Sequence, residues 1–377
     1  MNEQTKRDFE TREMLVSAGL LNKSELGDLV SYNYTDQCTY ERHWTDITIA
    51  ARGTIYNKVT GEVVARAFDK FFNLNEHEST KIENLPKLPF SVSVKEDGSL
   101  GILFEYEGGW RVATRGSFRS DQAEWATKKL NSGEFFMNLW PAEWTPLVEI
   151  IYAENKIIVD YMGFEGLILI GARHKHTGKH MSHKNLMACA NAVGFRTRHG
   201  VVADVDELVV RAKTLDGNEE GWVITYESDL MVKIKGARYI EIARFASHLN
   251  PQNIWEKMMK GDPVAFITGL PDELHVQANE MHKRLRDDWL WLETQAQIIG
   301  SDIGVPFEQT VEDWDRKDKL ALIERIKLQP KWCHSYLFGA MRGVRHEGVR
   351  DLLRRLEPFA GKFVEVATIC GVAREHV

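Results

Sequence analysis

The sequence lacks several features that would assign it to a class at once. No run of roughly 18 consecutive apolar residues occurs, which excludes a helical membrane span. The N-terminal residues 1–7 contain no apolar signal core, so we expect a protein that stays in the cytoplasm. Internal repeats and low-complexity segments are absent as well, so the chain is expected to fold as ordinary globular domains.

Cysteine and positive charge are also scarce. The four cysteines form no Cys-x-x-Cys pair, and we expect reduced thiols in a cytosolic protein. The formal net charge is -7, which does not indicate a protein that coats nucleic acid with positive surface. Any polyanion would therefore be held by a local basic patch, and salt would weaken its binding.

The sequence does contain a strand-rich part followed by a helical part. A chain of 377 residues with 43% hydrophobic residues is long enough for two domains, each with its own core. In the first part, alternating apolar residues bounded by turn residues predict strands, whereas helical spacing predicts a short helix within 8–27 and others from Ser120, over 187–193 and over 205–213. The expected strands lie at 30–34, 47–56, 62–66, 90–94, 101–104, 110–117, 147–152, 166–173, 219–226 and 230–235.

Beyond residue 243 the strand pattern disappears. Apolar residues at helical spacing predict a long helix from Pro271 to a stop at Gly300, with further helices over 240–259, 308–328 and 348–357. We therefore expect an α/β (α+β) domain with antiparallel sheets over residues 1–243. An all-α domain is expected over residues 244–377.

One short stretch of the first domain, Lys95-Glu96-Asp97-Gly98-Ser99-Leu100, combines a lysine with a tight turn. It separates two expected strands, and Gly98 allows backbone angles that other residues resist. Burial lowers the pKa of a lysine, and a neutral amine is a nucleophile for phosphorus or carbonyl centres. The other interpretation is an exposed hairpin turn in which Lys95 and Asp97 are merely solvated.

Charged residues recur inside other expected strands. Glu149 stands within an apolar strand, where it needs a cation, a metal or a hydrogen-bond donor. Lys233 and Lys235 share one face of a strand, which suits a polyphosphate, although a water-facing sheet would look the same. Lys70 is enclosed by phenylalanines, where it could also simply extend over an aromatic cluster.

Taken together, these motifs resemble the phage T4-type RNA ligase 1 family of covalent nucleotidyltransferases, over residues 30–243. The motifs occur in the family's order and with family-like spacing, and Ser31-Tyr32-Asn33-Tyr34 and Ala51-Arg52-Gly53 match segments typical of this branch. The stretches that carry the resemblance are Lys95-Glu96-Asp97-Gly98-Ser99, Leu147-Val148-Glu149-Ile150, Glu220-Gly221-Trp222-Val223, Val232-Lys233-Ile234-Lys235 and Asp69-Lys70-Phe71-Phe72-Asn73-Leu74-Asn75-Glu76.

The resemblance implies an ATP-dependent RNA ligase that joins RNA 5′-phosphate and 3′-hydroxyl ends. Lys95 would form a covalent lysyl-AMP, AMP would pass to the RNA 5′-phosphate, and a 3′-hydroxyl would displace it. Lys233 and Lys235 would contact the α-phosphate and hold Lys95 neutral. Glu149 would hold the ribose, and Glu220 would lie beside Lys95 and the metal.

The resemblance also implies the rest of the nucleotide site. Mg²⁺ or Mn²⁺ would accompany ATP, with Glu220 and Asp262 as candidate metal contacts, although Asp262 could equally be a solvated residue at a helix end. Arg115 stands where the family often has lysine. The residues expected to bind the nucleotide, in addition to Lys95, Glu149, Lys233 and Lys235, are Tyr32, Arg52, Lys70, Phe72 and Tyr239.

The expected partners are RNA ends, with nicked tRNA as the natural substrate if the phage analogy holds. We expect a monomer without membrane contact, in the host cytoplasm if the protein is viral, and a helical domain that governs RNA preference. Three alternatives remain: a catalytically silent RNA-binding module on this scaffold, an ATP-dependent DNA ligase, and a GTP-using capping enzyme. The last two usually continue into a five-stranded barrel, for which the sequence gives no pattern.

Overall fold

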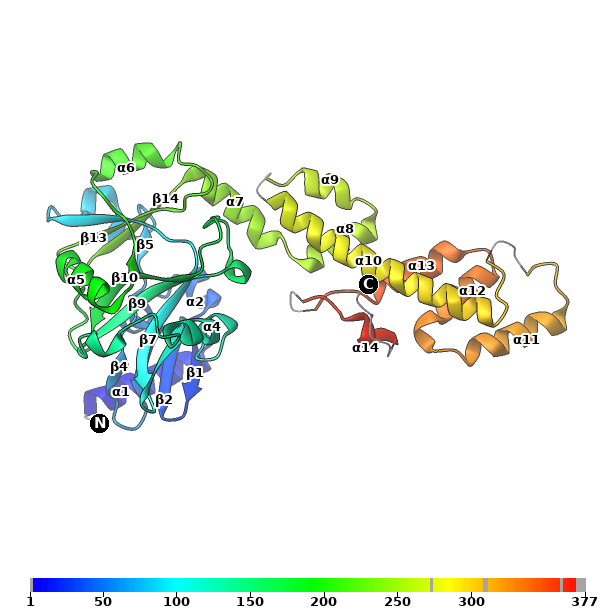
Figure 1. Cartoon of the computed structure of the whole chain (residues 1–377), viewed down its shortest axis with the longest axis horizontal. Helices are drawn as coiled ribbons and strands as arrows, with labels where there is room; N and C mark the ends of the chain where they lie inside the picture. The colour runs from blue at the N-terminus through cyan, green and yellow to red at the C-terminus, as the bar shows by residue number, and fades with distance from the viewer. Residues whose placement is uncertain (1–2, 272–273, 308–310, 360–361, 371–377) are drawn as a thin grey trace. The chain divides into compact units, whose positions relative to one another are not determined.

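The computed structural model describes residues 3–271, 274–307, 311–359 and 362–370, and the chain divides into two compact units. The first unit is Met1–Glu241 and the second is Ile242–Val377 (Figure 1). All strands lie in the first unit, and the second is built from helices. Within the described ranges, no helix has the length and apolarity needed to cross a membrane.

Three sheets form the framework of the first unit, and nearly all of their strand pairs are antiparallel, as the sequence predicts. The two parallel pairs are β10–β11 and β14–β5. Sheet A has the order β1-β2-β3-β4, made of β1 (Leu21–Leu26), β2 (Leu29–Tyr34), β3 (Arg52–Asn57) and β4 (Val63–Ala65). Sheet B has the order β12-β6-β13-β14-β5, made of β12 (Gly200–Val201), β6 (Phe90–Val94), β13 (Gly221–Tyr226), β14 (Met231–Lys235) and β5 (Phe72–Asn73). Sheet C has the order β11-β10-β9-β7-β8, made of β11 (Arg196–Thr197), β10 (Gly166–His174), β9 (Trp144–Ile151), β7 (Ser99–Tyr106) and β8 (Gly109–Thr114).

The α-helices of the first unit between residues 36 and 212, α2 to α6, begin at residues with capping side chains. Ser120 accepts a hydrogen bond from the backbone of Ala123 at 3.2 Å, so the helix expected from Ser120 begins there. Asp204 caps the next long helix in the same way, through the backbone N–H of Glu207. The helices are α1 (Glu3–Ser17), α2 (Asp36–Tyr40), α3 (Asp46–Ala50), α4 (Asp121–Leu130), α5 (His183–Val193), α6 (Val205–Ala212) and the first residues of α7 (Ala237–His248).

Two sequence predictions near the N-terminus are wrong. The helix expected within 8–27 ends at Ser17, and the strand β1 follows it. Gly27 does not end a helix: with a φ of 55°, it forms the turn that connects β1 to β2. The strand expected over 47–56 begins only at Arg52, after the short helix α3. Thr45 caps that helix by accepting from the backbone of Thr48 at 3.3 Å, a local bond that strand periodicity does not reveal.

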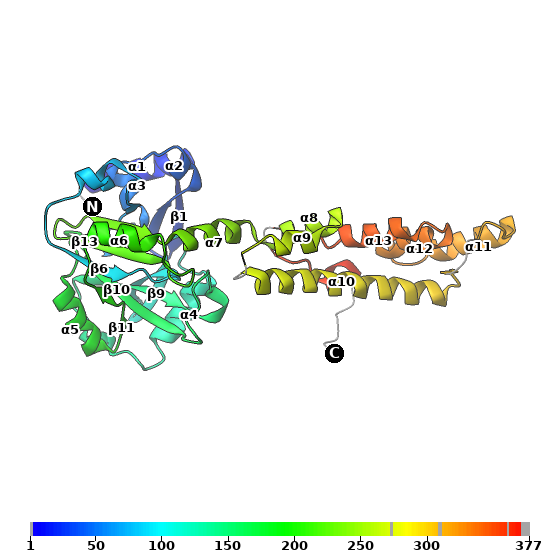
Figure 2. The ribbon, with the colours of Figure 1, turned by 90° about the horizontal axis from the view of Figure 1, so that it is seen from above.

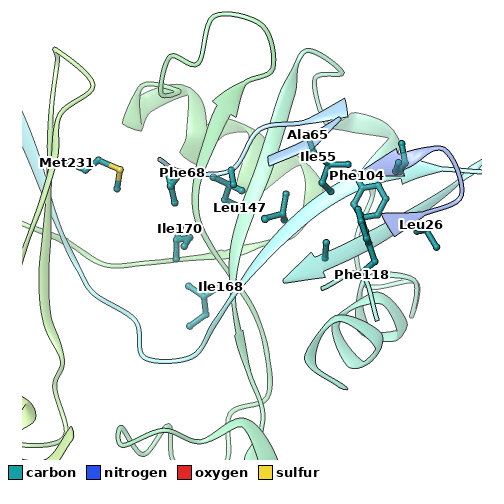
Figure 3. Packing of buried hydrophobic residues seen from close by; sticks show 14 of the residues in the cluster. Leu26, Ile55, Ala65, Phe68, Phe104, Phe118, Leu147, Ile168, Ile170 and Met231 are labelled. Carbon is teal, nitrogen blue, oxygen red and sulfur yellow. The ribbon is translucent and has the colours of Figure 1, made fainter. Parts of the chain in front are cut away.

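A shared hydrophobic core joins the sheets. It contains Ile55 from sheet A, Leu147 and Ile170 from sheet C, and Met231 from sheet B. Figure 3 shows Met231, Phe68 and Ile170 at one side of this cluster. The contribution of every sheet to one core fixes the three relative to one another.

The stretch around Lys95 does not close a hairpin, as the sequence had led us to expect. β6 pairs with β13 and β12 in sheet B, whereas β7 pairs with β8 and β9 in sheet C. Residues 95–98 therefore carry the chain from one sheet to the other. Alternating apolar residues predict a strand but do not identify its partner, which explains the error.

The second unit consists of helices around one core. The long helix α10 runs along α8, α12 and α13 (Figure 2). Its core includes Leu292 of α10, Leu322 of α11, Leu337 of α12 and Leu352 of α13. The helices are the remainder of α7, then α8 (Pro251–Lys260), α9 (Pro263–Thr268), α10 (His275–Asp302), α11 (Arg316–Lys327), α12 (His334–Met341), α13 (Arg345–Arg354) and α14 (Val366–Cys370).

Several helix boundaries differ from those predicted. The helix expected over 240–259 is divided, because Asn250 caps a new helix that begins with Pro251. The long helix continues past Gly300 to Asp302. Gly300 does not end the helix, and its lack of a side chain lets Phe307 and Leu337 approach the helix backbone. The helix predicted over 308–328 begins only at Arg316, and residues 308–310 lie outside the described part.

Candidate active site

A pocket of about 490 Å³ opens between sheets B and C, beside the crossing at Lys95. Its walls carry side chains from β6 and β14 of sheet B, from β9 and β10 of sheet C, and from β3 of sheet A. Six residues that the sequence singled out line it together: Arg52, Lys95, Glu149, Glu220, Lys233 and Lys235.

Glu220 links two of the lysines at the centre of this pocket. Its Oε2 accepts a hydrogen bond from Lys95 Nζ at 2.6 Å, and its Oε1 lies 2.8 Å from Lys235 Nζ. The Glu220 side chain is only 3% exposed, so both contacts are shielded from bulk water. The next residue, Gly221, has a φ of 133°, and a side chain there would collide with the carbonyl of Ile234 on β14.

Buried hydrogen bonds hold the loop that carries Lys95. Asp97 is 4% exposed, and its Oδ2 accepts from the backbone N–H groups of Ile158 and Val159, both at 2.9 Å. Its Oδ1 accepts from the hydroxyl of Tyr239 at 2.7 Å. Tyr161 adds two contacts, accepting from the backbone N–H of Asp97 and donating to Glu96. Asp97 therefore fixes the loop and does not face the pocket.

Glu149 points from β9 toward the base of the same loop. One of its carboxylate oxygens accepts from the backbone N–H of Gly98 at 3.0 Å. Burial, together with the nearby Glu220, raises the pKa of Glu149 to about 7, although Lys95 opposes the change. Glu149 can thus hold or release a proton near neutral pH.

A second group of cations surrounds the ring of Phe71. The Arg52 guanidinium lies 5.2 Å from the ring centroid, and Lys233 Nζ lies 5.4 Å from it. Burial, with help from Lys70 and Lys235, lowers the pKa of Lys233 to about 7. Burial also lowers the pKa of Arg52, whose Nη1 has no partner among the described residues. This end of the pocket is suited to an anion with several charges.

Four residues expected to bind the nucleotide lie outside the pocket lining. Lys70 and Phe72 line a neighbouring hollow of about 220 Å³, where Lys70 Nζ lies 4.6 Å from the Phe72 ring centroid. Tyr32 is buried in the cluster beneath α1 and donates to Glu13 at 2.7 Å. Tyr239 bonds Asp97, and Lys235 Nζ lies 5.0 Å from its ring centroid. These side chains support the pocket from behind or beside it.

The two candidate metal contacts are not brought together within either unit. Glu220 belongs to the first unit, with both oxygens engaged by lysines, and Asp262 belongs to the second, where it precedes α9. Within the described ranges, no group of three or more His, Cys, Asp or Glu side chains could hold a metal ion.

Sequence reasoning missed three residues at this site. Phe71 lines the pocket between Arg52 and Lys233, and strand alternation relative to Lys70 could have identified it. Tyr34 accepts a hydrogen bond from Arg115 Nη1 at 3.4 Å, a contact between residues 81 positions apart that local patterns do not reveal. Arg198 lines the pocket from an irregular segment, for which the sequence offers no signal.

Known proteins similar to this chain share one description. A family model described as RNA ligase matches residues 50–239, just over half of the chain. A protein of Thermovibrio ammonificans described as a candidate RNA ligase is 32% identical over 225 residues, which cover 56% of each chain. RNA ligase 1 of bacteriophage TS2126 is 26% identical over 233 residues, covering 58% of this chain and 57% of the phage protein.

Among solved structures, an archaeal ATP-dependent RNA ligase aligns with 90% of this chain and 77% of its own, at 14% identity and a TM-score of 0.45. The aligned region spans about half the length of the two curated relatives. The matched residues 50–239 include Lys95, Glu149, Glu220 and the lysine pair of β14. The chain therefore belongs to the T4-type RNA ligase family.

Proposed function

We propose that this protein is an ATP-dependent RNA ligase that works through a lysyl-AMP intermediate. One observation carries the proposal: the Lys95 amine lies 2.6 Å from a buried carboxylate, in a pocket that Arg52, Lys233 and Lys235 also line. A nucleophilic amine needs a group to take its proton, and a triphosphate needs fixed cations. Membership of the RNA ligase family supports the same chemistry.

In the first step, the lone pair of Lys95 Nζ attacks the α-phosphorus of ATP. An N–P bond forms, the bond from phosphorus to the bridging oxygen breaks, and pyrophosphate leaves with that electron pair. Glu220 Oε2 is positioned to accept the proton that Nζ loses. Lys235 and Lys233 would stabilise the charge on the phosphoryl oxygens, and Arg52 would hold the departing phosphates.

The next two steps move the AMP group and release it. An oxygen of an RNA 5′-phosphate attacks the α-phosphorus, and the N–P bond breaks to return Lys95. A 3′-hydroxyl then attacks the activated 5′-phosphate, AMP leaves, and a phosphodiester forms. Each step passes through a crowded anionic phosphorus, so the same lysines serve throughout.

We propose that the divalent metal enters with the nucleotide. Both oxygens of Glu220 already face lysines, and one oxygen of Glu149 faces a backbone N–H. Glu220 and Glu149 thus leave few carboxylate oxygens free in the pocket. This suits Mg²⁺, or Mn²⁺ in its place, because such an ion would be held mainly by phosphate and water. The metal neutralises part of the triphosphate charge.

The remaining sequence-based assignments are part of the same proposal. Residues 1–243 would carry the nucleotide chemistry, and residues 244–377 would select the RNA, with nicked tRNA as the substrate of a phage-type repair enzyme. Tyr32, Lys70, Phe72 and Tyr239 would act by shaping the pocket. A silent RNA-binding module is disfavoured because all five proposed catalytic side chains line one pocket, and a DNA ligase or capping enzyme is disfavoured by the family match.

Lysine adenylylation tests the proposal directly. ATP labelled at the α-phosphate, together with Mg²⁺, should leave a covalent label on the wild-type protein, and added pyrophosphate should remove it. Lys95→Ala should take up no label, because no other amine occupies its position. The matched control is Lys128→Ala on the exposed face of α4, which should label like the wild type. Wild-type protein freed of bound AMP that stays unlabelled would refute the proposal.

A further inference from the structure

Arg198 adds a cation to the pocket wall, and its charged neighbours, Glu96 and Glu149, differ from those of Lys233. It lies in the short segment between β11 and β12, which crosses from sheet C to sheet B as residues 95–98 do. Its backbone N–H donates to Leu169 on β10 at 3.4 Å, while the carbonyl of His199 accepts from Val94 at 2.9 Å. Two crossings between the same sheets therefore bound the pocket, and one of them carries Arg198.

The guanidinium of Arg198 has charged neighbours but no hydrogen-bond acceptor among the described residues. It donates no side-chain hydrogen bond to any residue in the described ranges, although guanidinium has five N–H donors. Burial lowers the pKa of Arg198 to about 10, against the opposing effect of Glu96 and Glu149. Arg198 is half-buried in the pocket wall, so its unmatched donors indicate a ligand that supplies acceptors there.

Aromatic and apolar side chains of the core share the pocket wall with Arg198. Arg198 and Phe68 together border both the pocket and a smaller hollow beyond it. Phe68 stacks on His180 with 5.5 Å between ring centroids, and Ile170 and Met231 lie nearby in the same core (Figure 3). An aromatic base fits beside Phe68 and Arg198, since the triphosphate is directed toward Arg52 and Lys233.

Glu96 supplies an acceptor beside the Arg198 donor. Its side chain lines the pocket, and its Oε2 accepts from the hydroxyl of Tyr161 at 3.1 Å, which fixes the carboxylate. Tyr161 also accepts from the backbone N–H of Asp97, so Glu96 is held in line with the loop that carries Lys95. The pocket thus presents a donor group and an acceptor group near one another.

We propose that Arg198 and Glu96 read the edge of the adenine base and select ATP over GTP, an inference that rests on the proposed function. The guanidinium donates to a ring nitrogen flanking the 6-amino group, N1 or N7, and the carboxylate accepts from that amino group. Guanine carries a carbonyl oxygen at the 6-position, which meets the Glu96 carboxylate without a proton between them. A buried polar group without its partner rejects the wrong base.

Nucleotide analogues test the role of Arg198. In wild-type protein, either 1-deaza-ATP or 7-deaza-ATP should adenylylate Lys95 with a kcat/KM roughly 10- to 100-fold below that of ATP. Arg198→Met keeps the length of the side chain and removes its donors. It should therefore lower kcat/KM for ATP and remove the difference in kcat/KM between ATP and whichever deaza analogue the wild-type protein disfavours. Lys128→Met, on the exposed face of α4 and outside the pocket lining, is the control, and it should keep the wild-type ratio. An analogue penalty that survives in Arg198→Met overturns the assignment.

The 6-amino group tests Glu96 in the same way. Wild-type protein should prefer ATP over GTP and over purine riboside triphosphate, which lacks the amino group, and Glu96→Ala should narrow both preferences at least about 10-fold. Each preference is a ratio of two kcat/KM values measured on the same variant, so partial misfolding does not affect it. If the wild-type protein disfavours neither GTP nor purine riboside triphosphate, that result alone overturns the inference. Absence of any lysyl-AMP in wild-type protein refutes the proposed function, whereas normal labelling with unchanged ratios refutes only the reading of the base.

Discussion

Lys233 lines the pocket, but the burial of its charge lowers the stability of the folded protein. Its ammonium is desolvated beside Lys70 and Lys235, which lowers its pKa from 10.5 to about 7. Between these values the unfolded chain binds a proton that the folded chain does not, so stability rises with pH across this window. Below pH 7 both states are charged, and the folded state bears the full cost of burying the cation.

Replacing Lys233 should therefore stabilise the protein and inactivate it. Lys233→Met should raise the free energy of unfolding at pH 7 by roughly 0.5–2 kcal/mol, because an apolar side chain of similar length removes the buried charge. The gain should shrink when urea denaturation is repeated near pH 10, while adenylylation falls at least about 100-fold at either pH. Lys128→Met, on the exposed face of α4, should change neither quantity. A less stable or an active Lys233→Met protein would contradict this account.

At the scale of elements, the crossing between sheets B and C determines the geometry of the site. Gly98 lies against β9, where an added Cβ would come 2.5 Å from the carbonyl oxygen of Ile150 and 2.6 Å from Ile151 Cδ1. The same glycine donates its backbone N–H to Glu149. Any side chain here must push the loop away from the strand.

Gly98→Ala should consequently weaken both fold and activity. We expect a loss of about 1–3 kcal/mol in the free energy of unfolding, measured by urea denaturation, from the clash with the backbone of β9. Displacement of Lys95 from Glu220 should lower the rate of adenylylation by about 100-fold. Gly109→Ala at the start of β8 is the matched control, because its added Cβ would meet nothing within 4 Å. Equal effects of the two substitutions would show that the packing at Gly98 is unimportant.

The same crossing explains what the sequence could and could not predict. Strand alternation and motif spacing identified Glu149, Lys233 and Lys235, because these signals are local or belong to the family pattern. The long-range contacts are not encoded locally: Asp97 bonds Val159 and Tyr239, which lie 62 and 142 positions farther along the chain. Arg198 lies in an irregular segment whose position depends on the meeting of two sheets. No periodicity in the sequence therefore predicts that it lines the pocket.

Local geometry also redirected individual side chains. The register of β2 against β3 shifts because β3 holds an extra residue between Arg52 and Ile55. On β2 itself, Tyr32 bonds Glu13 of α1 and Tyr34 bonds Arg115. In the helical unit, Asn250 falls inside the predicted helix 240–259 but caps a new helix, and Gly300, predicted to stop the long helix, lies within it. Composition distinguished the two classes of structure, but single caps and contacts set the ends of the helices.

At the scale of the whole molecule, the pocket belongs to the first unit alone. Every residue that lines it falls between Arg52 and Lys235, while the second unit begins at Ile242. Helix α7 contains the boundary, since it runs from Ala237 to His248 and carries Tyr239, whose hydroxyl bonds Asp97. A cut that keeps α7 therefore preserves the support of the Lys95 loop.

A chain that ends at His248 should separate the two proposed activities. Lysyl-AMP formation with labelled ATP should stay within about 10-fold of the full-length rate, because the residues lining the pocket are all present. Joining of a labelled single-stranded RNA should fall much further if residues 244–377 select the substrate. Circular dichroism and thermal melting would establish that the shortened chain is folded. Equal losses in both assays would argue against this division of labour.

The bridging position of Glu220 has a consequence for the order of events in catalysis. Before reaction, this carboxylate balances two ammonium groups, and the surplus positive charge draws in the triphosphate. Under the proposed chemistry, Lys95 exchanges its positive charge for an attached anionic phosphoryl group while Glu220 takes up the proton, so the local positive charge falls. The smaller positive charge holds pyrophosphate less tightly, so the chemical step itself favours its release before the RNA 5′-phosphate enters the pocket.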